Sequence, residues 1–329
     1  MSEINRELNW AILGTGAIAH EMAEGLKKMG KVPYAVANRT YEKAVSFAEK
    51  YGVKTVYENV DDLFADENVD IIYISTPHNK HYPYMKKALE SGKHILVEKA
   101  ITLNSDELDA MIKLAESKNL VIAEAMTIWH MPIYKKIRGI LESGELGKVQ
   151  IMTVNFGSYK PYDMSNRFFN MELAGGVLLD IGVYALSMVR NFMSEAPDRV
   201  LSQWRPSPAG SDEQASIILM NKQDQMASVA LSLHSKQPKR AIISCEKGYI
   251  EVMDYPRADK AVIVDAETGE KREITEGTTE DALYYELCDM EQAVKSGDTT
   301  SLQLSNSKDV MDIMTALRKE WGLKYQEEI

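Results

Sequence analysis

Residues 10–19 read WAILGTGAIA, an apolar run that is followed directly by two glycines, Gly14 and Gly16. The apolar run has the length of a buried parallel strand, and Ala17 to Lys28 has the spacing of an amphipathic helix. A glycine-rich turn between a strand and a helix lets the backbone approach a pyrophosphate, and the helix N-terminus supplies N–H groups and partial positive charge. The stretch predicts a dinucleotide site that includes Gly14, Gly16, Ala17 and Ile18. A tight turn that binds no ligand would have the same residues, so that alternative stays open on these positions alone.

The alternation of short apolar runs with longer amphipathic ones continues to about Glu124 and is typical of a parallel sheet built from βα units. The expected strands are Trp10 to Leu13, Tyr34 to Ala37, Ile71 to Ser75, His94 to Val97 and Leu120 to Ala123. The expected helices are Ala17 to Lys28, Tyr41 to Lys50, His81 to Glu90 and Ser105 to Ser117. We expect residues 1–123 to form a doubly wound Rossmann domain.

A second domain over residues 124–329 is expected because a chain of 329 residues exceeds the size at which one core usually keeps growing. After a helix at Ile133 to Ser143 and a strand at Val149 to Phe156, the pattern becomes a series of short strands. These are Ala215 to Met220, Met226 to Leu233, Ala241 to Cys245, Tyr249 to Met253 and Ala261 to Val264, and helices near Ala282 to Lys295 and Ser307 to Trp321 follow. The pattern predicts an α+β domain with a mostly antiparallel sheet and helices on one face.

Charge and composition exclude several classes of partner. A net charge of −11 argues against general binding to nucleic acid or to an anionic membrane surface. The N-terminus is polar and charged, and we find no apolar run that approaches the roughly 20 residues of a membrane span. Cys245 and Cys288 form no metal-ligand spacing, so a cytoplasmic location is expected.

The end of the second strand bears on the choice of cofactor. An NAD site places an acid there to bind the ribose 2′-hydroxyl, but this chain has Asn38, Arg39 and Thr40. Arg39 can pair with a 2′-phosphate and Thr40 can donate a hydrogen bond to it. We therefore expect NADP(H) to be preferred, with NAD(H) possible if Arg39 only stacks on the adenine.

The loop Ser75 to His81 leaves a strand beside the expected ribose and nicotinamide. Thr76, Pro77, Asn79 and His81 are therefore candidate cofactor contacts. His78 and His81 could suggest a metal pair, but no Cys or acid completes a site at a recognisable spacing, and we predict no metal.

Lys99 is the strongest catalytic candidate, because Glu98 and Lys99 follow the apolar run His94 to Val97 where a parallel strand opens into a ligand cleft. A lysine at an apolar strand end can exchange a proton with a substrate hydroxyl or stabilise charge on a carbonyl oxygen. Glu98 is predicted to orient this lysine or to contact the cofactor ribose. A solvated surface lysine is the alternative.

Asp180 interrupts an apolar stretch with helical spacing that follows Gly175-Gly176. A buried carboxylate needs a partner, and Tyr184 lies at i+4 on the same helical face. The pair could bind a sugar or polyol hydroxyl and share its proton, or Asp180 could cap a neighbouring helix while Tyr184 packs in the core. Arg167, just upstream, could reach substrate or form an ordinary salt bridge.

Taken together, these motifs resemble the Gfo/Idh/MocA oxidoreductases, and the resemblance runs along nearly the whole chain. The element Gly175-Gly176 to Tyr184 is most similar to the dihydrodiol dehydrogenase and glucose-fructose oxidoreductase branch. The resemblance implies an open-faced C-terminal sheet that mediates dimers or tetramers, reversible hydride transfer to nicotinamide, and Lys99, Asp180 and Tyr184 as the catalytic residues. The family motif is Glu-Lys-Pro, whereas Ala100 is the third residue here; a cis bond before alanine costs roughly 2.5 to 4 kcal/mol, so the geometry of the Lys99–Ala100 bond is left open.

The expected function is an NADP(H)-dependent dehydrogenase or reductase acting on a sugar, polyol or vicinal diol. Two alternatives remain: an NAD-dependent inositol-type dehydrogenase, against which Tyr184 and Arg39 both count, and a non-catalytic nucleotide-sensing regulator on the same fold.

Overall fold

The computed structural model describes residues 6–326 and residue 328, and the chain divides into two compact units. The first unit extends to Met126 and also takes in Asp281–Leu304. The second unit comprises Thr127–Glu280 and Ser305–Glu328. The segment Asp281–Leu304 therefore lies with the N-terminal unit, although the sequence pattern assigned it to the second domain.

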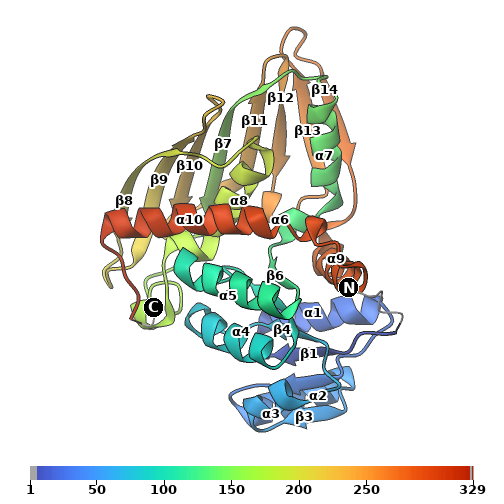
Figure 1. Ribbon diagram of the computed structural model, residues 1–329. Coiled ribbons are helices and arrows are strands. Elements are labelled where there is room, and N and C mark those ends of the chain that lie inside the picture. Colours follow the sequence, from blue (N-terminus) through green and yellow to red (C-terminus); the bar gives the residue numbers. More distant parts are fainter. Residues whose placement is uncertain (1–5, 327, 329) are drawn as a thin grey trace. The chain divides into compact units, whose positions relative to one another are not determined.

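The first unit is built on a six-stranded parallel sheet with the order β3-β2-β1-β4-β5-β6 (Figure 1). Its strands are β1 Trp10–Leu13, β2 Ala35–Ala37, β3 Thr55–Tyr57, β4 Ile71–Ile74, β5 His94–Glu98 and β6 Ile122–Ala125. This order confirms the predicted doubly wound sheet. The sequence pattern missed β3 because the strand has only three residues, all of them half-buried.

Helices connect these strands: α1 Ala17–Lys28, α2 Tyr41–Tyr51, α3 Val60–Ala65, α4 His81–Glu90 and α5 Ser105–Lys118. Their ends follow local chemistry. Gly52 ends α2 in the left-handed region at φ 74°, and the Asn104 side chain caps α5 by accepting a hydrogen bond from the Glu107 N–H.

The helix α9 (Ala282–Ser296) joins the first unit through both ionic and close-packed contacts. Glu291 accepts a hydrogen bond of 2.9 Å from the Trp10 indole and pairs with Lys31. Gly25 lets α9 approach α1, because a Cβ atom there would lie 3.0 Å from a methyl group of Leu287. Contacts of this kind join residues far apart in sequence, so hydrophobic periodicity alone could not assign the helix to its unit.

The second unit contains an eight-stranded sheet with the order β14-β13-β12-β11-β7-β10-β9-β8. The strands are β7 Val149–Gly157, β8 Arg199–Pro206, β9 Asp212–Met220, β10 Met226–Ser232, β11 Gln237–Cys245, β12 Gly248–Met253, β13 Lys260–Asp265 and β14 Lys271–Thr275. Only β7 and β10 pair in parallel, which confirms the mostly antiparallel sheet. The helices of this unit are α6 Thr127–His130, α7 Pro132–Glu142, α8 Val183–Phe192 and α10 Leu304–Trp321, whose first residue belongs to the other unit.

The two faces of this sheet differ in burial. Residues paired across neighbouring strands point to the same side, and the row Leu219, Ala227, Met152, Ile243 and Ile250 is completely buried beneath the helices. In Figure 1, α8 and α10 lie over this face, and the indole of Trp321 in α10 stacks on Trp204 of β8. The opposite row runs from Leu201 through Ile218, and these side chains are 69% and 46% exposed. The sheet therefore has one open face.

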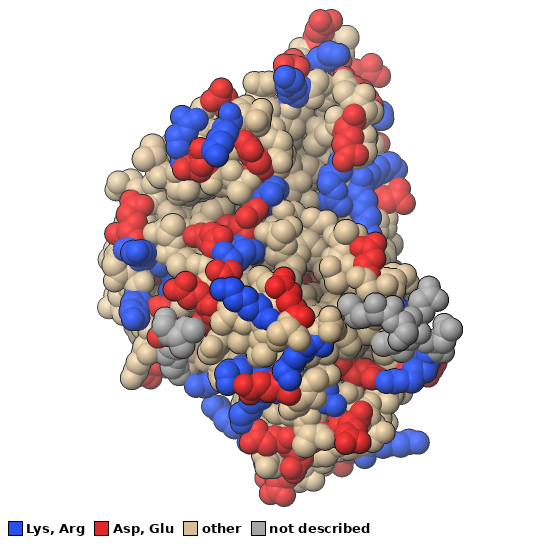
Figure 2. Space-filling model, viewed as in Figure 1, with Lys and Arg blue, Asp and Glu red and all other residues tan. Residues whose placement is uncertain are grey.

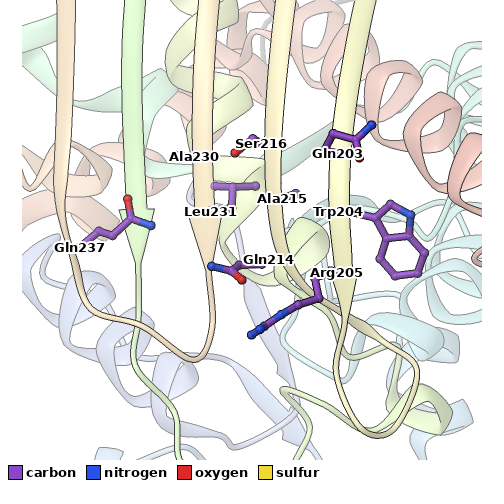
Figure 3. Close-up of a pocket in the computed structure, with 9 residues that line it drawn as sticks. All are labelled: Gln203, Trp204, Arg205, Gln214, Ala215, Ser216, Ala230, Leu231 and Gln237. Carbon is purple, nitrogen blue, oxygen red and sulfur yellow. The ribbon is translucent and has the colours of Figure 1, made fainter.

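A pocket of about 290 Å³ lies at one end of strands β8 to β11 (Figure 3). Its polar lining includes Gln203, Arg205, Gln214, Ser216 and Gln237. None of the residues that line it belongs to the catalytic or cofactor set predicted from the sequence.

Charged side chains of both signs are interspersed on the side of the molecule that Figure 2 shows. This side presents no continuous basic surface of the kind that binds a nucleic acid backbone.

One helical stretch, Met171–Phe192, is long and apolar enough to cross a membrane, which corrects the expectation that no such run exists. However, 83% of its most apolar window is buried within the protein, as in the core helix of a globular domain. The sequence pattern obscured this stretch because polar residues such as Asp180 interrupt it.

Candidate active site

The turn after β1 has the backbone geometry of a phosphate cradle. Gly14 has a φ of +100°, and a Cβ atom there would lie 2.5 Å from the carbonyl oxygen of Ser75, so only glycine fits. Gly16 is the N-cap of α1, no side chain caps this helix, and a Cβ on Gly16 would meet nothing within 4 Å. An uncapped helix N-terminus beside open space suits a pyrophosphate, so these residues fit a bound dinucleotide.

The residues after β2 form a fixed turn with one exposed cationic side chain. The Asn38 side chain donates a hydrogen bond of 2.9 Å to the carbonyl oxygen of Thr40 and thereby fixes the turn. Arg39 and Thr40 are exposed, and Arg39 forms no ion pair with any of the residues that the structure describes. Its guanidinium is therefore available to an anion.

The loop after β4 passes through Thr76, Pro77 and Asn79 before α4 begins at His81. Pro77 is the N-cap of a 3₁₀ turn at His78–Lys80, and Asn79 is buried. The Thr76 hydroxyl is buried and has no hydrogen-bond partner among residues 6–326 and 328. An orphaned hydroxyl in this loop fits a contact with a bound ligand.

His81 has a position that the sequence did not reveal. Its side chain is completely buried, with Nδ1 2.9 Å from the carbonyl oxygen of Ala100 and Nε2 2.9 Å from that of Thr76. Burial lowers the pKa of His81, and the surrounding carbonyl groups act in the opposite direction. The ring links the loop after β4 to the segment after β5, so the hydrogen bonds indicate a positioning role; its contact with a cofactor stays a prediction.

Lys99 follows β5 directly, and its peptide bond with Ala100 is cis. The neighbouring backbone is held at three points. His78 Nε2 lies 3.1 Å from the Lys99 carbonyl oxygen, His81 binds the Ala100 carbonyl, and the Ile101 N–H donates to Glu124 Oε1 over 3.1 Å. Lys99 itself is half-buried. The backbone that carries the lysine is thus held in a defined position.

Glu98 also has a fixed environment. The hydroxyl of Tyr73, in β4, donates a hydrogen bond to its carboxylate, and the Lys99 N–H donates to it over 3.3 Å. Tyr73 and Glu124 lie within strands as single polar groups, so no local motif in the sequence indicated that they support this site.

Asp180 and Tyr184 lie at the start of a buried helix in the second unit. Asp180 is in a π-helical turn, Leu178–Gly182, which leads directly into α8. π-helical turns are rare and occur frequently at functional sites. Asp180 is 7% exposed and Tyr184 is half-buried, with its ring 6.1 Å from that of Phe156. Lys99 belongs to the first unit, so the predicted catalytic residues come from both units.

Arg167 forms the salt bridge that was one of its two predicted roles. Its Nη1 lies 3.2 Å from Asp180 Oδ1, although the guanidinium side chain is 57% exposed. This pair supplies the partner that a buried carboxylate requires. Direct contact of Arg167 with substrate remains a prediction.

A buried carboxyl group and the C-terminal segment hold the start of this helix. Asp212, at the beginning of β9, accepts a hydrogen bond of 2.7 Å from the Leu178 N–H. The Tyr325 hydroxyl donates to the Gly175 carbonyl oxygen over 3.0 Å. Complete burial raises the pKa of Asp212 from its ordinary value of 3.8 to about 7, opposed by Leu178 and by the charge of Arg318.

This raised pKa predicts a pH-dependent stability. Folded Asp212 keeps its proton at pH values where the unfolded chain has lost it, so the wild type should lose stability as the pH rises from about 4 to about 7. Asp212→Asn keeps an acceptor for Leu178 but cannot ionise. Urea midpoints measured across this range should fall for the wild type relative to the variant, and parallel profiles would contradict the assignment.

Family models match most of the chain. Residues 8–126 match the oxidoreductase family with an NAD-binding Rossmann fold, and residues 134–251 match the GFO/IDH/MocA C-terminal domain. The chain belongs to the GFO/IDH/MocA oxidoreductase family. The match to the first domain includes the Gly14 turn and Lys99, and the match to the second includes Asp180 and Tyr184.

Similar members of the GFO/IDH/MocA family are named as enzymes. The chain is 28% identical to a trans-1,2-dihydrobenzene-1,2-diol dehydrogenase of Xenopus laevis, over 96% of this chain and 98% of the relative. The protein of the same name in Homo sapiens is 26% identical, over 98% and 99% of the two chains. The chain is thus an NAD(P)-binding dehydrogenase or reductase of this family.

Solved structures share the fold of this GFO/IDH/MocA chain. An aldose-aldose oxidoreductase of Caulobacter crescentus, complexed with glycerol, has a TM-score of 0.86 at 21% identity, and the match covers 97% of this chain and 99% of the other. A 3-ketoreductase of Actinomadura kijaniata in complex with NADP and TDP-benzene has a TM-score of 0.85 at 19% identity, with coverage of 95% and 98%. At these identities the likeness establishes the fold alone.

Proposed function

We propose that the protein is an NADP(H)-dependent oxidoreductase of a sugar, polyol or vicinal diol, with Lys99 as the acid/base residue. The observation that carries the proposal is the placement of Lys99 at the carboxyl end of β5, on backbone held by His78, His81 and Glu124. Ligands of doubly wound sheets bind at this end of the strands. A protein that only senses a nucleotide would not need a lysine at this strand end on backbone held at three points.

The proposed reaction transfers a hydride and a proton, and different groups carry each of them. When bound, the nicotinamide accepts or supplies the hydride. Lys99 takes the proton from the substrate hydroxyl on oxidation and returns it to the carbonyl oxygen on reduction, as general acid/base catalysis requires. Asp180 and Tyr184 bind the substrate hydroxyl groups, with Arg167 holding the Asp180 carboxylate in place.

The proposed substrate class is drawn from the names of similar proteins, which include dihydrodiol dehydrogenases and an aldose-aldose oxidoreductase. Both names describe substrates with neighbouring hydroxyl groups. The proposal is tested by mixing the protein with NADP⁺ or NADPH and a panel of sugars, polyols, diols and their carbonyl forms. We expect a change at the nicotinamide absorbance band for at least one member, and a protein that binds NADPH but converts none would contradict the proposal.

The preference for NADP(H) is proposed from Arg39, which is exposed and forms no ion pair within the described part of the chain. A carboxylate in its place would repel the 2′-phosphate, so Arg39→Asp should weaken NADPH binding by about tenfold to a hundredfold. Calorimetric titration of the wild type and the variant with NADPH and NADH checks this, and NADH affinity serves as the internal control. An Arg39→Asp protein that keeps its full preference for NADPH would remove the basis of the assignment.

We further propose that the open face of the second sheet joins two copies of this chain in a dimer or tetramer. Leu201, Ile218, Ile151 and Met226 present exposed apolar side chains on this face, in two adjacent rows of paired residues. Apolar side chains gathered on one sheet face are typical of an interface between subunits.

We also propose a cytoplasmic location, with which the two free cysteines, Cys245 and Cys288, accord.

The assembly can be tested by placing a charge on this face. Ile218→Lys should shift the protein towards the monomer in light scattering coupled to size-exclusion chromatography, because a buried unpaired charge opposes association. Val32→Lys, which replaces a 55% exposed apolar residue of the other unit, is the matched control and should leave the mass unchanged. A wild type that is already monomeric would contradict the proposal.

A further inference from the structure

Two lysines lie close to the aromatic residues around Asp180 and Tyr184, and neither belongs to the site residues predicted from the sequence. Lys160 follows the end of β7, where its N–H donates a hydrogen bond of 2.7 Å to the carbonyl oxygen of Leu233. Lys239 lies in β11, the strand that pairs with β7. Both lysines belong to the second unit and are half-buried.

Lys239 approaches the site through Phe156. Its ammonium group is 5.3 Å from the centre of the Phe156 ring, and this ring lies 6.1 Å from the ring of Tyr184. Phe156 is only 6% exposed, so it forms a firm support for the lysine side chain. The charge of Lys239 is therefore held beside a ring that also belongs to the Tyr184 environment.

Lys160 is linked to Asp180 indirectly, through Phe168 and Arg167. Its ammonium group is 4.4 Å from the centre of the Phe168 ring, and the guanidinium carbon of Arg167 is 4.3 Å from the same centre. Arg167 in turn pairs with Asp180. The Phe168 ring therefore contacts two cations, and one of them, Arg167, pairs with the Asp180 carboxylate.

The charge at this place is not balanced by the protein. Neither Lys160 nor Lys239 forms an ion pair with a residue that the structure describes, and Arg167 is occupied by Asp180. Nearby carboxylates have other partners: Asp163 accepts hydrogen bonds from Ser165, and Glu213 binds Tyr162 and Arg205. In a chain with a net charge of −11, two ammonium groups without an ion-pair partner among the described residues are a local exception, one held next to the ring that contacts Tyr184 and the other next to the ring that contacts the partner of Asp180.

We infer that Lys160 and Lys239 bind an anionic group of the substrate, a carboxylate or a phosphate, while Asp180 and Tyr184 bind its hydroxyl groups. Aromatic rings hold the lysine stems by cation–π contact and leave the ammonium N–H groups free to donate to an anion. The inference rests on the proposed oxidoreductase function, since it names the class of substrate at the same site. It predicts that acidic or phosphorylated sugars and polyols are better substrates than their neutral counterparts.

The kinetic test compares matched substrates with NADP⁺. Glucose, glucuronate and glucose 6-phosphate, with equivalent sets from other sugars, separate the neutral, carboxylate and phosphate forms. We expect kcat/KM to favour one charged form, and Lys160→Gln or Lys239→Gln to reduce the charged-to-neutral ratio at least roughly tenfold. Lys236→Gln removes the same charge from an exposed neighbour and should preserve the ratio, and Lys239→Arg should retain most of it.

A binding test works without turnover. With NADP⁺ saturating, so that the Gly14 turn is occupied, inorganic phosphate or acetate should raise the melting temperature of the wild type. The double variant Lys160→Gln/Lys239→Gln should lose this effect, whereas Lys236→Gln should keep it. If these binding results are obtained but no substrate is converted, the anion site is supported and the proposed oxidoreductase function is contradicted.

The inference is overturned if neutral substrates are preferred, or if the variants change the charged and neutral reactions equally. A Lys236→Gln effect as large as that of Lys239→Gln would also overturn it, because a general electrostatic field would then explain the preference. The inference is also overturned if the wild type and the double variant Lys160→Gln/Lys239→Gln bind phosphate and acetate equally.

Discussion

Replacing Lys99 by methionine is expected to reduce kcat by about 10²- to 10⁴-fold, the range that a general acid/base residue contributes. Methionine keeps much of the length and apolar stem of lysine but cannot transfer a proton. The melting-temperature increase caused by NADPH should persist, because the Gly14 turn and Arg39 are unchanged. Steady-state kinetics and thermal unfolding of the same preparation measure both effects.

The matched control for this variant is Lys54→Met, which alters an exposed lysine of the same unit. It should retain wild-type turnover. Undiminished turnover in Lys99→Met would refute the proton-transfer role, and loss of the NADPH-induced shift would mean that the substitution had damaged the cofactor site.

Gly176→Ala is expected to lower the free energy of unfolding by about 4 kcal/mol or more. Losses of this size are rare among single substitutions and are typical of severe steric overlap in the core. Gly176 has a φ of +148°, and an added Cβ would lie 1.9 Å from Asp212 Oδ1. The clash would displace the carboxyl group that holds the Leu178 N–H at the start of the helix bearing Asp180. Urea unfolding measures the loss.

Gly210→Ala separates the steric effect from backbone strain. Gly210 also has a positive φ, +89°, but a Cβ atom there would meet nothing within 4 Å. Strain of this kind alone costs on the order of 1–3 kcal/mol. If the two alanine variants unfold at the same urea concentration, the contact between Gly176 and Asp212 does not have the importance that the structure gives it.

The fold was largely predictable because its main signals are local. The strand, turn and helix from Trp10 to Lys28 show the periodicity of a βα unit, and the structure places these elements within a residue or two. Short strands and strands at the sheet edges were harder to predict from the sequence. The pattern did not predict β8, which contains no fully buried residue, or β14, whose one buried residue is Ile274.

Within the candidate site, the sequence predicted only the residues that belong to local motifs. Lys99, Asp180 and Arg39 stand out because a charged residue interrupts or ends an apolar run. The groups that support them do not, since Tyr73, His78, Glu124 and Asp212 act through contacts between distant parts of the chain. The assignment of α9 to the first unit depends on such contacts as well.

Proton transfer by Lys99 is tested most directly by a single-turnover measurement with enzyme in excess over substrate and saturated with NADP⁺, using the best substrate of the panel. We predict that the wild type reduces one equivalent of cofactor per substrate consumed, seen at the nicotinamide absorbance band. Lys99→Met should bind the cofactor but carry out this step about 10²- to 10⁴-fold more slowly. Equal rates for the two proteins would contradict the assignment of Lys99 as the residue that moves the proton.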